Sequence, residues 1–280
     1  MPDNPYPPAP HWFFLPDHGV ISLSGRDATA FLQAQTMNDV ARLRDGEWQW
    51  SGWLTAKGRV IALFALLRLS PETCWLLLPD ADAAALADAL RRYVFRSKVA
   101  IEHRSDLHVA GCGAASAFAS GGHAVDIDGA IELDLGGSRS LRIGAQLQTL
   151  ATDDADAVLA WRAQDLAHGW PRLDASQREQ WTPQQLSLER LQAFSVKKGC
   201  YPGQEIVART HFLGQAKRGL VCVRSDAPLS PGTELPVDAD ASAGVVVSVA
   251  GTLALAVAPH EAPSAGAGWR ATPLLDGLAR

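Results

Sequence analysis

One nonapeptide carries most of the information in this sequence: Lys197-Lys198-Gly199-Cys200-Tyr201-Pro202-Gly203-Gln204-Glu205. Gly199 and Gly203 flank the Cys200–Tyr201 pair, so the chain must turn tightly there. The two lysines just before the cysteine would favour its thiolate form if their charges lie near the sulfur. Cys200 is therefore our candidate for a reactive thiol. The alternative, a cysteine packed as a small apolar side chain, stays open.

The charge of this region differs from that of the rest of the chain. The 280 residues carry a net charge of −5, whereas the segment from Lys197 to Arg218 carries +4, so the remainder sums to −9. A basic loop that contains Tyr201 suits an anionic aromatic ligand, because the ring can stack on it and the cations can pair with it. The overall acidity argues against a protein whose whole surface binds nucleic acid.

Composition predicts a globular protein without a membrane segment. With 47% hydrophobic and 20% charged residues, the chain resembles ordinary folded proteins. Its longest apolar run, 60–67, is far shorter than the roughly 18 residues that span a bilayer. Residues 1–10 lack the basic start and apolar run of a secretory signal. No cysteines form a CxxC pair, so we expect reduced thiols and a cytoplasmic location.

Hydrophobic periodicity predicts interleaved strands and helices. Apolar runs typical of strands occur at 20–23, 60–69, 74–78, 99–102, 107–110 and 131–135, and helical patterns occur at 27–37, 81–96 and 154–168. After Arg218, short β-rich runs alternate with Pro, Gly and Ser, which is typical of a small barrel or sandwich. We therefore expect an α+β fold.

Other common catalytic patterns are absent from the sequence. The eight histidines show no HExxH spacing, so no metal site is expected. Neither GxSxG nor a phosphate-binding lysine loop occurs, which excludes the usual serine hydrolases and nucleotide hydrolases. Trp161 lies in the third predicted helix beside Arg162 and Asp165, where it could stack on a flat heterocycle. A core position for Trp161 is the alternative.

The nonapeptide and its surroundings closely resemble the signature of the YgfZ family of folate-binding proteins. The KGCYxGQE core is the most specific part of the resemblance. Weaker agreement extends over most of the chain. The matching segments are 25–28, 31–36, 38–40, 56–59, 169–174, 183–188 and 194–209.

This family is related to the T-protein of the glycine cleavage system, an aminomethyltransferase that uses tetrahydrofolate. The resemblance implies a three-domain T-protein-like arrangement around a central cavity, with two ferredoxin-like α+β domains and a C-terminal β-barrel. The implied limits are 1–50 plus 152–205 for a split folate-binding domain, 51–151 for an inserted ferredoxin-like domain and 206–280 for the barrel.

The resemblance also implies a function. The chain would bind tetrahydrofolate or a one-carbon derivative and act as an accessory protein in the assembly or repair of iron–sulfur proteins, including tRNA-modifying enzymes. Its partners would be folate and iron–sulfur client or assembly proteins, with tRNA as an indirect partner. Cys200 matches the functionally important cysteine of the family. The implied folate contacts are Trp161, His18, Lys198, Tyr201, Gln204, Glu205 and Arg209.

Two positions depart from the family pattern. Enterobacterial members bind folate with two tryptophans; Trp161 matches one, but His18 stands near the other. T-proteins carry an acidic pair where this chain has Ala62 and Leu63. A positioned acid contributes roughly 10²- to 10⁴-fold to a rate. A noncatalytic folate-dependent factor is therefore favoured over an active aminomethyltransferase or demethylase, and a noncatalytic module that binds tRNA or another anion is a third alternative.

Overall fold

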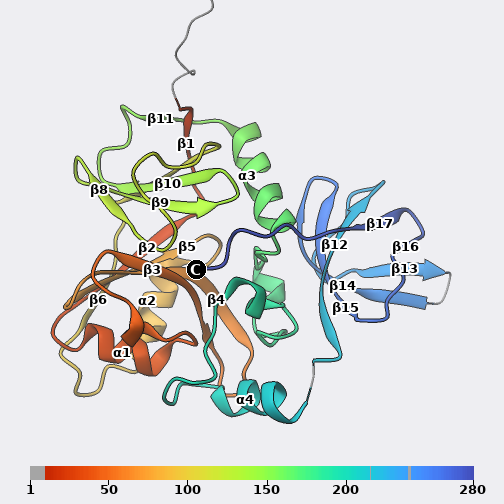
Figure 1. Cartoon of the computed structure of the whole chain (residues 1–280), viewed down its shortest axis with the longest axis horizontal. Coiled ribbons are helices and arrows are strands. Elements are labelled where there is room, and N and C mark those ends of the chain that lie inside the picture. Colours follow the sequence, from red (N-terminus) through yellow and green to blue (C-terminus); the bar gives the residue numbers. More distant parts are fainter. Residues whose placement is uncertain (1–9, 215, 239–240) are drawn as a thin grey trace, which may run out of the picture.

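The computed structural model describes residues 10–214, 216–238 and 241–280. Within these ranges the chain forms three sheets and four α-helices (Figure 1), so the α+β class predicted from the sequence is confirmed. No helix in these ranges is both long and apolar enough to cross a membrane. Residues 1–9, most of the N-terminal segment that is expected not to be a secretory signal, lie outside the described ranges.

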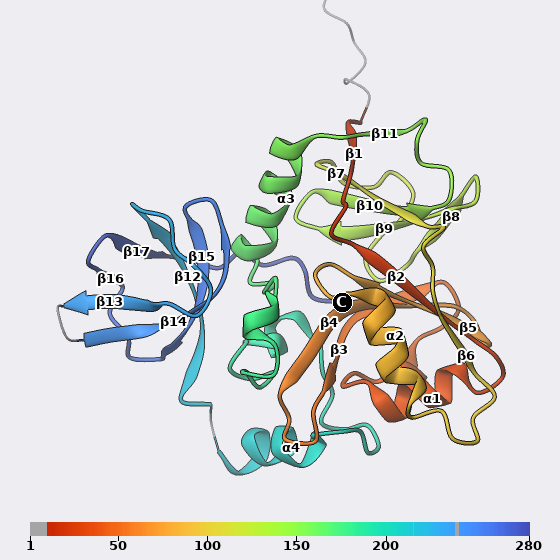
Figure 2. The ribbon, with the colours of Figure 1, turned by 180° about the vertical axis from the view of Figure 1, so that it is seen from behind.

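The five-stranded sheet has two buried faces. Its strand order is β3 (Glu47–Leu54), β4 (Val60–Ser70), β5 (Thr73–Leu78), β2 (Gly19–Ser24) and β6 (Ala100–His103). The helices α1 (Ala28–Gln35) and α2 (Ala83–Arg91) cover one face (Figure 2), where Phe64 and Leu66 pack. Leu63, Ala65 and Leu67 point to the other face and join the main core. Because both faces are covered, β4 is a continuous apolar run rather than an alternating one.

A six-stranded sheet lies beside it. Its order is β11 (Ala151–Thr152), β1 (Trp12–Phe14), β7 (His108–Cys112), β10 (Arg139–Gly144), β9 (Ala130–Gly136) and β8 (Val125–Ile127). The helix α3 (Ala155–Ala167) follows, and the Asp154 carboxylate caps it by accepting the Ala157 N–H at 2.9 Å. α3 confirms the helix predicted at 154–168, and it runs between this sheet and the C-terminal strands (Figure 1).

The C-terminal sheet is nearly closed into a barrel. Its order is β13 (Glu234–Asp238), β14 (Ala241–Ala250), β15 (Leu253–Pro259), β12 (Arg218–Ser225), β17 (Trp269–Thr272) and β16 (Ala265–Gly266). The two edges approach each other where Trp269 Nε1 donates to the Pro236 carbonyl at 2.7 Å. Val223, Leu235 and Val246 fill its interior. The barrel character predicted from the sequence is therefore observed.

The sheets divide the chain differently from the predicted domain limits. The limit between residues 50 and 51 falls inside β3, and β1 joins a sheet whose other strands come from 108–152. The limit between 205 and 206 falls inside α4 (Gln204–Leu213). The number of domains and the ferredoxin-like assignment stay predictions.

Irregular segments connect these layers at the centre of the molecule. Short 3₁₀ turns occur at Val40–Arg42, Ala175–Gln177 and Leu188–Leu191. After β17, residues 273–280 run from the C-terminal sheet to the middle of the molecule (Figure 1). There Leu278 is buried in the main core, and its carbonyl accepts the Trp50 Nε1–H at 2.5 Å.

Candidate functional site

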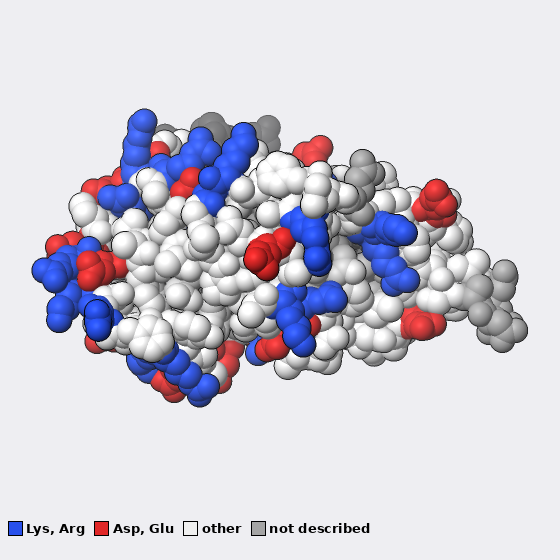
Figure 3. All heavy atoms as spheres, turned by 90° about the horizontal axis from the view of Figure 1, so that it is seen from below, with Lys and Arg blue, Asp and Glu red and all other residues white. Residues whose placement is uncertain are grey.

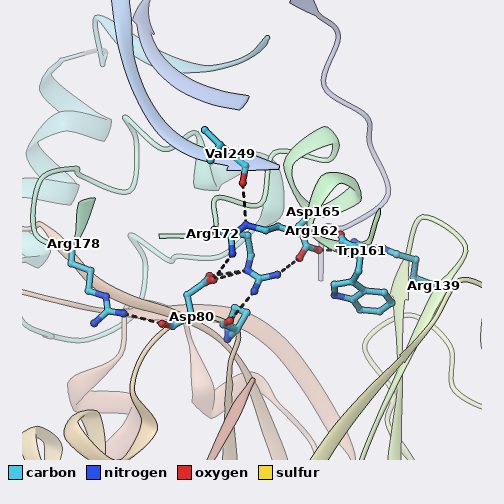
Figure 4. A network of polar contacts seen from close by, with 9 residues as sticks. Asp80, Arg139, Trp161, Arg162, Asp165, Arg172, Arg178 and Val249 are labelled. Atoms are coloured by element: carbon cyan, nitrogen blue, oxygen red, sulfur yellow. Dashed lines mark hydrogen bonds and ion pairs between the residues drawn. The ribbon is translucent and has the colours of Figure 1, made fainter. Parts of the chain in front are cut away.

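A network of buried charges occupies the junction of the three sheets (Figure 4). Asp165 on α3 pairs with Arg139 of β10 at 2.7 Å and with Arg172 at 3.0 Å. Arg172 Nε also donates to both carboxylate oxygens of Asp80, which follows β5, at 2.8 Å each. Arg139 and Arg172 are 1% and 2% exposed. Because buried charges require partners, these pairs fix the relative positions of α3 and the two N-terminal sheets.

Two further arginines extend the network. Arg162 Nε donates to the Val249 carbonyl of β14 at 3.1 Å, and its Nη1 lies 3.8 Å from Asp80 Oδ1. Arg178 Nη2 donates to the Asp80 carbonyl at 2.8 Å. Burial raises the pKa of the Asp80 carboxyl, against the opposing effect of Arg172. Four arginines surround two carboxylates, so the network has an excess of positive charge.

A pocket of about 510 Å³ opens onto this network, and we call it the polar pocket. Asp80, Arg162 and Arg178 line the polar pocket together with three further aspartates, Asp17, Asp82 and Asp174. A smaller cavity adjoins the polar pocket and shares Asp80 and Arg178 with it. The polar pocket therefore presents both cationic donors and anionic acceptors to a ligand.

The positions matched to the T-protein acidic pair border the smaller cavity. Ala62 and Leu63 lie on β4, where both are buried, and both line that cavity. Asp80 lines it as well, from the end of the neighbouring strand β5. Ala62 and Leu63 therefore stand where T-proteins carry the acidic pair, and Asp80 brings a carboxylate to the same cavity from the end of β5.

The structure brings Trp161 and His18 together. Both line an enclosed cavity of about 20 Å³, together with Trp50, Trp170 and Asp165. Such a volume accommodates about one water molecule, so this cavity has no room for a heterocycle. Each residue also lines a larger pocket, Trp161 one of about 480 Å³ and His18 one of about 540 Å³. Burial, assisted by nearby arginines, lowers the pKa of His18 well below its usual value, which leaves the imidazole neutral at physiological pH.

Trp161 is itself a packed side chain. It is 3% exposed, with the Arg139 guanidinium 4.6 Å from the centre of its ring. The Phe13 ring meets it edge-on at 5.8 Å. Trp161 therefore occupies a core position, the alternative to a stacking role, although it also forms part of a pocket wall.

Lys198 anchors the nonapeptide to the end of α1. Its Nζ donates to the carbonyls of Thr36 at 2.6 Å and Asn38 at 3.0 Å, and it lies 5.0 Å from the centre of the Tyr201 ring. Burial lowers the pKa of Lys198 to about 8. These two hydrogen bonds hold the ammonium group among backbone carbonyls, so Lys198 shapes the loop that carries Cys200.

Two glycines join the nonapeptide to the turn at 56–59. Gly203 has φ +80°, and a Cβ placed on it would lie 2.6 Å from Gly58 Cα. The loop is also tied internally, because Gln204 Nε2 donates to the Lys198 carbonyl at 3.0 Å and Tyr201 Oη donates to the Ser195 carbonyl at 3.3 Å. Two segments separated by about 140 residues therefore form one surface.

Cys200 lies on the outside of this loop. It is exposed, whereas the other three cysteines are buried. Lys197, Glu205 and Arg209 are exposed as well. The view from the side of α4 (Figure 3) shows basic side chains in separate groups, interrupted by acidic and uncharged surface. The basic segment therefore does not form one continuous cationic patch on this face.

The predicted site residues fall into two groups. Trp161 and His18 lie at the centre of the molecule, whereas the other expected folate contacts belong to the Cys200 loop and α4. This second group comprises Lys198, Tyr201, Gln204, Glu205 and Arg209. No residue of 197–209 lines the pockets described above.

The amino-acid sequence of this chain is similar to those of known proteins. No family model matches the chain. The tRNA-modifying protein YgfZ of Cronobacter sakazakii is 31% identical over 226 residues, which cover 74% of this chain and 68% of that protein. The YgfZ of Colwellia psychrerythraea is 30% identical over 229 residues, covering 75% and 70%. The chain belongs to the YgfZ family.

A solved structure extends the relation to the T-protein. Aminomethyltransferase T of the glycine cleavage system from Bartonella henselae has a TM-score of 0.68 at 15% identity. The match covers 89% of this chain and 78% of that chain. This YgfZ-family protein therefore has the T-protein fold, as the resemblance in its sequence implied.

The buried network of this YgfZ-family chain has no local pattern in the sequence. Arg172 lies in the matching segment 169–174, which is the one signal that could have singled it out. Its partner Asp80 is 92 residues away, and Arg139 pairs with a residue 26 positions later. Pairs at such separations follow no local spacing rule, so only the fold reveals them.

Proposed function

We propose that this protein binds tetrahydrofolate or a one-carbon derivative at its centre and acts as an accessory factor in the assembly or repair of iron–sulfur proteins, including tRNA-modifying enzymes. The observation that carries the proposal is the polar pocket, where Asp80, Arg162 and Arg178 meet at the junction of the sheets. The T-protein fold and the name of the YgfZ relatives support it.

The chemistry of the polar pocket suits a folate. A pterin ring presents adjacent N–H donors that a carboxylate such as Asp80 can accept, and a folate tail carries carboxylates that guanidinium groups bind in pairs. Arg162 and Arg178 are the available cations on the pocket wall. The volume of about 510 Å³ lies within the range of roughly 300–1,000 Å³ typical of ligand pockets.

The Cys200 loop has a separate role in this proposal. Its thiol is exposed and lies on a loop whose shape Lys198 and Gly203 fix. We assign Cys200 to contact with an iron–sulfur client or assembly protein, and the exposed Lys197 and Arg209 to recognition of that partner. A cytoplasmic location would keep this thiol reduced.

Titration with tetrahydrofolate, followed by tryptophan fluorescence and calorimetry, tests the central assignment. We expect saturable binding to the wild-type protein and affinity at least about tenfold weaker for Arg178→Met, because a charge-assisted contact is lost. Arg190→Met is the matched control, since Arg190 pairs with the exposed Asp276 and does not line the polar pocket. Absence of saturable binding to the wild type would overturn the folate assignment.

One observation favours a second candidate function, folate-dependent one-carbon transfer or demethylation. Asp80 places a carboxylate in the cavity that Ala62 and Leu63 border, where an acid could assist proton transfer. A turnover assay with tetrahydrofolate and a methylamine-type donor decides between the two. Under the accessory-factor proposal no sustained product forms, whereas turnover that Asp80→Asn abolishes would establish the transferase.

A further inference from the structure

The chain between α2 and β6 carries a group of exposed basic and aromatic side chains, and we call residues 91–98 the α2–β6 connection. Its sequence is Arg91-Arg92-Tyr93-Val94-Phe95-Arg96-Ser97-Lys98, with four cations and no carboxylate. Phe95 is 85% exposed and Tyr93 is 43% exposed. Figure 2 shows the connection at the outer edge of the molecule. One exposed apolar side chain needs no explanation, whereas two rings set among four cations indicate a surface that meets a partner.

The α2–β6 connection is fixed to the fold from within. Val94 packs against the core that α1 and α2 cover. Arg91 Nε donates to the Ile101 carbonyl of β6 at 2.8 Å, and the Lys98 N–H donates to Asp27 Oδ2 at 2.6 Å. These contacts hold both ends of the connection and its middle. The exposed rings are therefore presented on a fixed backbone, so that binding requires little further ordering of the chain.

Tyr93 is held in place by a second aromatic ring. The ring of Trp53, which is 5% exposed, meets it edge-on with 5.7 Å between the ring centres. α2 ends at Arg91, before the end of the helix predicted at 81–96, so Tyr93 follows the helix. One part of the Tyr93 ring is packed and the rest faces solvent. Two aromatic rings, one of them supported by a tryptophan, are therefore available for stacking.

Most cations of the connection are not neutralised by carboxylates. Arg91 pairs with Asp88 of α2. Three exposed cations that form no ion pair within the described part of the chain are Arg92, Arg96 and Lys98. Arg26 is exposed beside them, and a Cβ placed on its neighbour Gly25 would lie 2.2 Å from the Lys98 carbonyl. The positive charge of this surface is therefore available to an anionic partner.

The chemistry of these side chains identifies the class of partner. Exposed cations pair with phosphates, and aromatic rings stack on the faces of unpaired bases. In a duplex the base faces are covered by their neighbours, so only a single strand offers both contacts at once. An anionic membrane is the alternative, but a helix that lies on a membrane inserts a broad apolar face. The apolar face of α2, with Leu86 and Leu90, is buried in the core instead.

We propose that the α2–β6 connection binds single-stranded nucleic acid. Phosphates pair with Arg92, Arg96 and Lys98, and unpaired bases stack on Phe95 and Tyr93. This direct contact goes beyond the proposed function, in which tRNA-modifying enzymes are served through protein partners. It rests neither on folate binding nor on the exposed thiol.

Fluorescence anisotropy with labelled oligonucleotides tests the inference. The probes are a single strand of about 12 nucleotides, made as RNA and as DNA, and the duplex of the same sequence. We expect saturable binding of a single strand and affinity at least about fivefold weaker for the duplex, which offers no base faces for stacking. The tighter of the two single strands identifies the polymer.

The salt dependence of this binding reports the phosphate contacts. Between about 50 and 200 mM salt, the logarithm of the association constant should fall against that of the salt concentration with a slope of about −2, since three phosphates are paired. Undetectable binding, binding that does not respond to salt, or duplex binding as tight as that of the single strand would overturn the inference.

Substitutions separate stacking from charge. Phe95→Ala should weaken binding of the single strand about fivefold or more and leave the salt slope unchanged, because it removes a stacked ring and no charge. Arg96→Gln should instead reduce the slope by about 0.7, since one phosphate contact is lost. Phe118→Ala is the matched control, because Phe118 is 63% exposed in a loop, 113–124, without lysine or arginine. Unchanged affinity of Phe95→Ala, or an equal loss in Phe118→Ala, contradicts the assignment.

Two further measurements test rival surfaces and partners. Phe212 is 65% exposed in the basic segment 197–218, so loss of binding in Phe212→Ala, with Phe95→Ala unaffected, would place the site there instead. Co-sedimentation with vesicles of phosphatidylglycerol and phosphatidylcholine tests the membrane alternative, and we expect the wild type to stay in solution. Sedimentation that Phe95→Ala abolishes, without oligonucleotide binding, would assign the connection to a membrane. Failure of tetrahydrofolate to bind changes none of these outcomes, so this inference and the proposed function fail separately.

Discussion

The Cys200 loop and the network around Asp165 hold their charged groups in opposite ways. Lys197 of the loop and Arg209 of the adjoining helix α4 are exposed, and backbone geometry at Gly203 shapes the surface on which they lie. In the network, Arg172 is buried and pairs with carboxylates from two parts of the chain. Exposed ion pairs contribute little to stability, whereas removing one member of a buried pair is costly. Stability should therefore depend on the network, and reactivity on the loop.

Asp165→Asn should have the largest effect on stability. The substitution leaves Arg139 and Arg172 buried with too few negative partners, and breaking a buried ion pair costs about 3–5 kcal/mol. Urea denaturation followed by circular dichroism measures the free energy of unfolding. Asp156→Asn is the control on the same helix, because Asp156 is exposed in the first turn of α3 and its loss should cost about 0.3–1 kcal/mol. Equal effects of the two substitutions would show that the network contributes no more than surface charge.

Gly203→Ala should come next. Alanine at φ +80° is strained by about 1–3 kcal/mol, and its Cβ would also lie 2.6 Å from Gly58 Cα. The loop must move away from the turn at 56–59, so the free energy of unfolding falls. Gly199→Ala in the same loop is the control, since a Cβ there meets nothing within 4 Å. A stable Gly203→Ala protein would contradict the close packing of the two glycines.

Lys198 should make stability depend on pH. Its pKa is about 8 in the folded protein and about 10.4 in an unfolded chain. Between these values the unfolded chain binds more protons, so the contribution of Lys198 to the free energy of unfolding rises with pH, by at most about 1.4 kcal/mol per pH unit. Denaturation of wild type and Lys198→Met from pH 7.5 to 9.5 measures the difference. Parallel profiles for the two proteins would contradict the lowered pKa.

Tyr201, which lies against Lys198, should act in the opposite direction at higher pH. Burial raises the pKa of Tyr201 to about 12, above the value of about 10 in an unfolded chain. The folded protein then holds the proton that the unfolded chain loses, so stability falls as the pH rises above about 10. The Tyr201→Phe protein should not show this fall in the free energy of unfolding. Its difference from wild type therefore changes with pH in the opposite direction to that of Lys198→Met.

The comparison also explains which features could be predicted from the sequence. The apolar run at 60–69 and the helical pattern at 154–168 identify β4 and α3, because a strand buried on both faces is continuously apolar and a helix buried on one face has a helical period. The nonapeptide identified Cys200 as the candidate reactive thiol, because its flanking lysines and glycines and the family motif are contiguous in the sequence. The pairing of β1 with β7 and the ion pair between Arg172 and Asp80 join residues about 100 and 92 positions apart. Such contacts arise from the fold as a whole.

Cys200→Ser should have the smallest effect on stability and a large effect on function. Cys200 is exposed, and substitutions at such positions change the free energy of unfolding by about 0.5 kcal/mol or less. If the thiol contacts an iron–sulfur client, cells that carry this variant should lose a readout of tRNA thiolation while the purified protein retains its fold and its tetrahydrofolate binding. Cys222→Ser is the reverse control, because Cys222 is buried in β12 and a hydroxyl there costs about 1–3 kcal/mol without touching the exposed thiol. Full cellular activity of Cys200→Ser would remove the thiol from the mechanism and leave the loop with a purely structural role.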